Sequence, residues 1–193
     1  MKELSSQGLA GGGEGIDSRF KPDVILQDGE IITTNDWTLT ALHTPGHIGN
    51  HLSLIWGDAV FSGDHVMGWA SSLVSPPDGD LTDFMTSCAK LHALNARILY
   101  PAHGAPITAP NARIDWLTNH RLTREAQVLK ALLRGPKTTA KITSEIYTDI
   151  DPALLAAAER NVFAHLVDLH QRAKITATPT LSTDAKFNPS EEN

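Results

Sequence analysis

The chain of 193 residues contains a single cysteine, Cys88. One cysteine excludes a framework of intrachain disulfides and fits a reducing compartment. No apolar run approaches the roughly 18 residues that a membrane span requires. The N-terminus also lacks the basic start and apolar stretch of a secretory signal. We therefore expect a cytoplasmic protein.

The chain also lacks the positive charge of a globally basic nucleic-acid binder, because its net charge is −6. Between residues 113 and 141, however, seven basic residues accompany only two acidic ones. Such a stripe can follow a phosphate backbone, with Arg121, Arg124 and Lys130 as candidate contacts. A solvated helix face is the alternative, and aromatic side chains for base stacking are few there, namely Trp116 and Tyr147.

Histidine is absent from residues 1–42, and all nine histidines follow. Three of the turns after residue 42 place a histidine or an aspartate beside glycine at the end of a strand-like segment. These residues are His47, Asp64 and His103. Imidazole and carboxylate groups without thiolate suit Zn²⁺, Fe or Mn. The three turns therefore predict a metal site.

Strand-like segments and one helix alternate up to residue 110. Asp28-Gly29 predicts a hairpin turn between residues 24–26 and 31–33, and Gly57-Asp58 predicts another between residues 51–56 and 59–61. Residues 37–42 alternate as a half-buried strand. Residues 81–95 have the apolar spacing of an amphipathic helix with Cys88 on its buried stripe, and residues 97–100 form a strand. This alternation predicts an α/β layered domain.

The remaining pattern is three helices followed by a strand, the outline of a winged helix. The helices are expected over residues 113–134, over 138–147 and after Asp151-Pro152, and the strand over 174–177. We therefore expect a flexible, glycine-rich leader (1–20), a first domain (21–110), a winged-helix-like domain (111–178) and a polar, frayed tail (179–193).

Residues 43–47 (HTPGH), 61–64 (FSGD) and 100–104 (YPAHG), in this order, resemble the later metal motifs of the metallo-β-lactamase superfamily. The resemblance runs from about residue 23 to residue 175. It is strongest to the lactamase-like branch with a C-terminal winged helix, which includes endoribonucleases acting on single-stranded RNA. It implies the C-terminal part of an αββα metallo-β-lactamase fold followed by a small winged-helix-like domain.

The resemblance also implies roles for single residues. His47, Asp64 and His103 correspond to metal ligands, and Asp64 corresponds to the catalytic aspartate that bridges two metals. His65 and His51 would border the substrate cleft, with His51 chiefly steadying its turn. A complete member would hold one or two Zn²⁺ ions, with Fe or Mn as alternatives. It would hydrolyse an ester, a thioester or an RNA phosphodiester by a metal-activated water.

The superfamily's principal His-x-His-x-Asp-His run has no counterpart in this sequence. Three ligands shared over two metal positions are few, since a catalytic zinc has three of its own. We therefore expect an N-terminally truncated form with weak or absent metal binding and little activity. The competing interpretation is a non-catalytic winged-helix module that binds nucleic acid on a degenerate lactamase-like scaffold. Loss of the first sheet would also leave an apolar sheet uncovered, which predicts a homo-oligomer.

Overall fold

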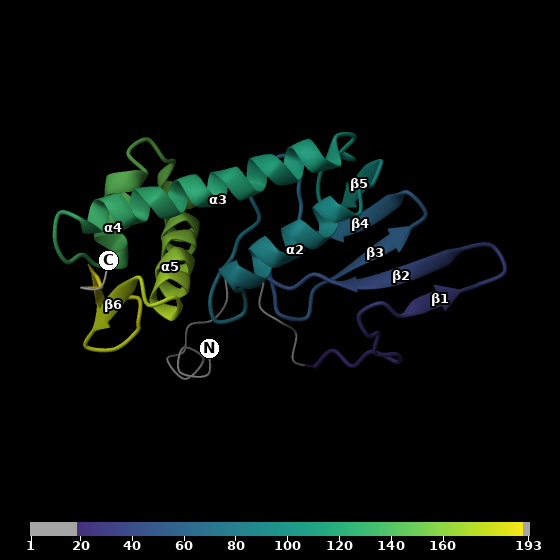
Figure 1. Cartoon of the computed structure of the whole chain (residues 1–193), viewed down its shortest axis with the longest axis horizontal. Coiled ribbons are helices and arrows are strands. Elements are labelled where there is room, and N and C mark those ends of the chain that lie inside the picture. The colour runs from purple at the N-terminus through teal and green to yellow at the C-terminus, as the bar shows by residue number, and fades with distance from the viewer. Residues whose placement is uncertain (1–18, 191–193) are drawn as a thin grey trace. The chain divides into compact units, whose positions relative to one another are not determined.

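The computed structural model of the chain describes residues 19–190. These residues form two compact units (Figure 1). The sheet unit comprises residues 19–72 and 82–119, and the helical unit comprises residues 73–81 and 120–190. The predicted leader lies almost entirely outside the described residues.

The sheet unit is built on one five-stranded sheet in the order β1-β2-β3-β4-β5. Neighbours from β1 to β4 are antiparallel, whereas β4 and β5 are parallel. A parallel pair needs a crossover connection, and α2 (Leu81–Ala93) lies in the chain between these two strands. The strands are β1 (Ile31–Thr33), β2 (Thr38–His43), β3 (Leu52–Trp56), β4 (Ala59–Gly63) and β5 (Ile98–Pro101).

The two faces of the sheet differ in burial. Val60 and Leu99 are paired across β4 and β5 and are 1% and 0% exposed. The opposite face carries the row Trp56, Phe61 and Tyr100, whose neighbouring rings stack with centroids 6.3 and 5.5 Å apart. This aromatic row lies in the open, since Trp56 is 50% and Phe61 39% exposed.

The predicted hairpin across Gly57-Asp58 is confirmed, but the one across Asp28-Gly29 is wrong. β1 pairs with β2 instead, with Ile31 opposite Thr40. Residues 24–26 form no strand, and Val24 and Ile25 are 68% and 72% exposed. The apolar run at residues 24–26 predicted a strand because β-branched residues are common in strands, but such residues also occur in extended segments outside a sheet.

The helical unit packs the C-terminal end of α3 (Pro110–Leu132) with α4 (Thr139–Ile146) and α5 (Leu155–Gln171). The 3₁₀ turn η1 (Pro152–Leu154) precedes α5 and contributes no buried residue. Thr138 caps α4, and Asp151 caps η1 through a bond from the Ala153 amide. Buried side chains from the three helices form one core, among them Leu132, Ile142, Val162, Leu166 and Leu169. This arrangement confirms the predicted helices.

A two-stranded wing completes the helical unit. β6 (Ile175–Thr178) pairs antiparallel with β7 (Lys186–Pro189). Phe187 of β7 is fully buried and exchanges backbone hydrogen bonds with Lys137. The prediction of a frayed tail is therefore wrong for residues 179–190, because one aromatic side chain in a polar segment reaches the core.

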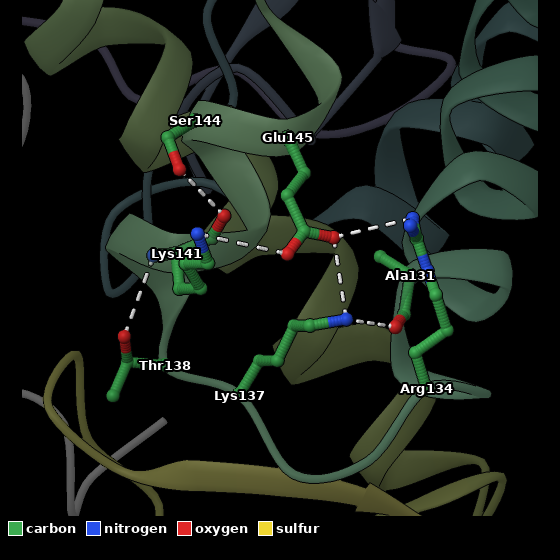
Figure 2. A network of polar contacts seen from close by, with 7 residues as sticks. All are labelled: Ala131, Arg134, Lys137, Thr138, Lys141, Ser144 and Glu145. Carbon is green, nitrogen blue, oxygen red and sulfur yellow. Dashed lines mark hydrogen bonds and ion pairs between the residues drawn. The ribbon is translucent and has the colours of Figure 1, made fainter.

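Glu145 of α4 forms ion pairs with several residues of the basic stripe (Figure 2). Its carboxylate lies 3.2 Å from Lys137 Nζ, 3.3 Å from Arg134 Nη2 and 3.9 Å from Lys141 Nζ. Lys137 Nζ also donates to the Ala131 carbonyl, and its side chain is 11% exposed. Three of the seven basic residues in the sequence stripe are thus paired with one acid just beyond that stripe.

The fold is mixed α/β, as predicted, with a sheet unit followed along the chain by a winged helix. None of the helices within residues 19–190 is long and apolar enough to cross a membrane.

We expect Glu145→Ala to lower the free energy of unfolding by about 1–3 kcal/mol, because it leaves the poorly exposed Lys137 ammonium without its carboxylate. Urea unfolding followed by circular dichroism measures the change. Glu159→Gln on α5 is the control, since Glu159 takes no part in this network. Equal stability of the two variants would contradict the role of Glu145.

Candidate metal centre

Three strands of the sheet end at the same edge. β2 and β4 are both antiparallel to β3, and β5 is parallel to β4, so β2, β4 and β5 run in one direction. His47 follows β2, Asp64 follows β4 directly, and His103 lies two residues beyond β5. The carboxyl ends of strands in an open α/β sheet are where ligands usually bind. All three predicted ligands therefore belong to this edge.

Asp64 and His103 lie together. His103 Nε2 is 3.7 Å from Asp64 Oδ1, and the side chains of His103 and Asp64 are 68% and 26% exposed. Asp64 Oδ1 is itself buried and accepts no hydrogen bond from the described residues. A buried carboxylate oxygen without a donor is costly unless a cation or proton approaches it. This oxygen and the adjacent imidazole nitrogen suit a divalent metal.

The turn that carries His47 is fixed by its neighbour Gly46. Gly46 has φ +136°, and a Cβ built on it would lie 2.3 Å from the backbone Cα of Phe84 on α2. The Pro45 carbonyl also accepts a hydrogen bond of 2.7 Å from Ser87 Oγ, one turn along the same helix. Only glycine permits the backbone of the turn to come this close to α2. Pro45 and Gly46 therefore hold the His47 turn against α2.

The predicted cleft residues His51 and His65 are buried, 8% and 0% exposed. His51 Nδ1 lies 2.9 Å from Thr44 Oγ1, and burial together with nearby His47 lowers the pKa of His51 to about 4. His65 packs on Phe84 and has its Nε2 3.7 Å from Cys88 Sγ. Neither ring lines an open surface, which corrects the predicted cleft role; Cys88 is core, as predicted.

The role of Arg113 is not visible in the sequence. In the sequence it is one member of the basic stripe, yet its Nε donates to the Met67 carbonyl and its Nη2 to the Ala70 carbonyl, each at 2.7 Å. Its guanidinium also lies 4.3 Å from the ring centroid of Trp116. Arg113 therefore holds the loop that follows Asp64. No local sequence signal marks a contact across more than forty residues.

Known proteins resemble the chain in both units. The family model described as beta-lactamase associated winged helix domain matches residues 138–181. A beta-lactamase-like protein 2 homolog of Caenorhabditis elegans is 34% identical over 140 residues, which are 71% of this chain and 46% of that protein. An atrochrysone carboxyl ACP thioesterase of Aspergillus chevalieri is 36% identical over 116 residues, 59% of this chain and 36% of the thioesterase.

A solved metallo-beta-lactamase family protein of Thermus thermophilus superposes with a TM-score of 0.75 at 24% identity. The match covers 88% of this chain and 55% of that one. The chain belongs to the metallo-β-lactamase superfamily. It carries the winged helix of the lactamase-like members at its C-terminal side. The chain spans about half the length of the curated relatives it matches.

The chain does not assemble a full ligand set within residues 19–190. No group of three or more histidine, cysteine, aspartate or glutamate side chains there is arranged to hold a metal ion. Asp64 and His103 come together, whereas His47 stays outside a three-ligand group with them. The described residues thus fit part of a metal site, and further ligands are needed to complete it.

The candidate nucleic-acid contacts occupy different environments. Arg121 is 3% exposed and donates to Asn161 Oδ1 at 2.9 Å, so it serves the interior of the helical unit. Arg124 lies 4.0 Å from the ring centroid of Tyr147 and donates to Gln127. The burial of Arg121 corrects its predicted role as a surface contact.

We expect Gly46→Ala to destabilise the sheet unit by at least about 2 kcal/mol more than Gly57→Ala. Both glycines have positive φ, so both substitutions carry backbone strain of about 1–3 kcal/mol. A Cβ at Gly57 meets nothing within 4 Å, whereas one at Gly46 collides with the backbone of α2. Thermal unfolding of the two variants measures the difference. Equal losses would show that the turn is not docked on α2.

Proposed function

We propose that this chain supplies Asp64 and His103 as ligands in the metal centre of a hydrolase that cleaves an ester or thioester. The observation that carries the proposal is the 3.7 Å approach of His103 Nε2 to the donor-free Asp64 Oδ1 at the carboxyl edge of the sheet. His47, on the same edge, is the third candidate ligand. Zn²⁺ is the expected metal, with Fe or Mn as alternatives.

In this chemistry a bound divalent metal supplies hydroxide near neutral pH by lowering the pKa of water to about 7. The residues of this chain orient the site. Asp64 presents a carboxylate that is held in place by the end of β4, and His103 presents Nε2 from the turn after β5. Because the described ligand set is partial, we expect little hydrolysis by residues 19–190 without additional ligands.

Charge favours an ester or thioester over RNA as the substrate. The described sheet unit contains eight acidic and five basic residues, which does not suit a polyanionic backbone. In the helical unit, Arg121 is buried, and Arg134, Lys137 and Lys141 are paired with Glu145. A thioesterase among the relatives supports the same choice. The lone buried thiol of Cys88 supports a cytoplasmic location.

Metal binding tests the proposal directly. Titration with Co²⁺, followed by its visible absorption, should show weak binding that Asp64→Asn and His103→Gln each reduce at least about tenfold, as expected when a ligand is lost. His92→Gln is the matched control. His92 also lies beside an aspartate, with its Nε2 3.3 Å from Asp115 Oδ1, but it is no part of the candidate centre.

Unchanged Co²⁺ affinity in Asp64→Asn and His103→Gln, or an equal loss in His92→Gln, would contradict a metal centre at this edge. Hydrolysis of an acyl thioester in the presence of metal, measured for the same variants, then shows whether the bound metal is catalytic.

We further propose that the chain forms a homo-oligomer through the aromatic row Trp56, Phe61 and Tyr100. The row is uncharged and partly exposed, and two copies can bury it against each other without pairing charges. Sedimentation equilibrium should show a dimer that Trp56→Glu dissociates. Leu122→Glu, at a 54% exposed site on α3, is the control. A monomer at high concentration would contradict this proposal.

A further inference from the structure

The loop that follows Asp64 is fixed along its length. The Ser62 hydroxyl donates to the Val66 carbonyl at 3.0 Å, and the Ser72 hydroxyl donates to the His65 carbonyl at 2.8 Å. Within the same loop, the guanidinium of Arg113 binds the carbonyls on either side of residues 68 and 69. The backbone that carries Trp69 is therefore held by side chains of the sheet unit.

This anchored loop nevertheless presents a large apolar side chain to solvent. Trp69 is 71% exposed, although the nearby Val66 and Met67 are 0% and 9% exposed. Full burial of a large apolar side chain is worth about 1.5–3 kcal/mol, and here most of that is not realised. A single exposed apolar residue is ordinary on a protein surface. An exposed aromatic side chain on an anchored loop beside a candidate active site is suited to bind a ligand, because ligand sites are lined mainly by apolar and aromatic side chains.

The indole lies against the turn that carries His103. A Cβ added to Gly104 would lie 2.9 Å from Trp69 Cδ1 and 3.5 Å from its Nε1. Gly104 has φ +93°, so glycine both permits the turn and leaves space for the ring. Since Gly104 follows His103 directly, the ring is next to the residue whose Nε2 faces Asp64.

The chemistry around Trp69 selects an uncharged group. Arg113 is the basic residue that contacts this loop. Its Nε and Nη2 donate to the Met67 and Ala70 carbonyls, and its guanidinium stacks on Trp116. An indole with an open face binds planar and apolar groups through dispersion and ring contacts. An acyl chain or aromatic acyl ring meets these requirements.

We propose that Trp69 contacts the acyl group of the substrate and sets a preference for large, apolar acyl groups. This inference rests on the proposed ester or thioester hydrolysis and deepens it. Binding energy from the non-reacting part of a substrate can be used to orient the scissile bond. A preorganised indole provides such energy at low entropic cost, because Arg113 already holds its backbone.

Binding without metal tests the inference. With EDTA present, the ¹⁵N-indole resonances of the chain are followed while the benzoyl thioester of N-acetylcysteamine is added. The Trp69 resonance is identified as the one missing in Trp69→Phe. We expect it to shift saturably, and we expect Trp69→Ala to weaken benzoyl thioester binding at least about fivefold while the acetyl thioester is affected less.

Two further variants sharpen the test. Trp37→Phe is the matched control, because Trp37 is a 41% exposed tryptophan of the same unit, and the affinity of this variant for the benzoyl thioester should equal that of the wild type. Gly104→Ala keeps the indole but displaces it, and should reduce the benzoyl-over-acetyl preference. Thermal unfolding of each variant shows that it is folded.

An unmoved Trp69 resonance at saturating thioester, or an unchanged benzoyl-over-acetyl preference in Trp69→Ala, overturns the inference. A shift with decauridylate and none with the thioester overturns it as well, in favour of base stacking. These failures are distinct from failure of the proposed function, which is decided by Co²⁺ binding in Asp64→Asn and needs no acyl ligand.

Discussion

The parallel pairing of β4 with β5 is the constraint on which the candidate site depends. If β5 ran antiparallel, His103 would emerge at the opposite edge of the sheet from Asp64. The pairing is held by buried side chains, since Val60 and Leu99 lie opposite each other with almost no exposure. Its register shifts between Phe61 and Gly63, directly before the carboxylate. Such irregularities re-aim side chains next to functional sites.

Glycines allow the turns at this edge to close on their neighbours. Gly46 lets the His47 turn touch the backbone of α2, Gly63 leaves room for the His51 ring, and Gly104 leaves room for Trp69. At each of these three positions a Cβ would lie within 3 Å of another atom. Each turn at this edge thus carries a candidate ligand or its neighbour, together with a glycine that allows close contact with the adjacent part of the fold.

Local signals predicted much of this structure. The hairpin at Gly57-Asp58 and the helices follow from turn chemistry and periodicity. The glycine-flanked turns predicted a metal site at His47, Asp64 and His103, and the last two of these lie together. Contacts distant along the chain could not be predicted, such as the burial of Phe187 in a tail whose sequence is polar. The pairing of Glu145 with three cations of the basic stripe is short-range, but Glu145 lies just outside that stripe in the sequence. The burial of Arg121 and the anchoring of the Trp69 loop by Arg113 likewise depend on tertiary packing.

Superfamily membership and the approach of His103 to Asp64 support the proposal that this chain contributes ligands to a metal centre. Anomalous diffraction from crystals soaked in Co²⁺ or Zn²⁺ tests this claim most directly. The account predicts an anomalous peak about 2.0–2.2 Å from both His103 Nε2 and a carboxylate oxygen of Asp64. A peak at His92 and Asp115 with none beside Asp64 and His103 would contradict it.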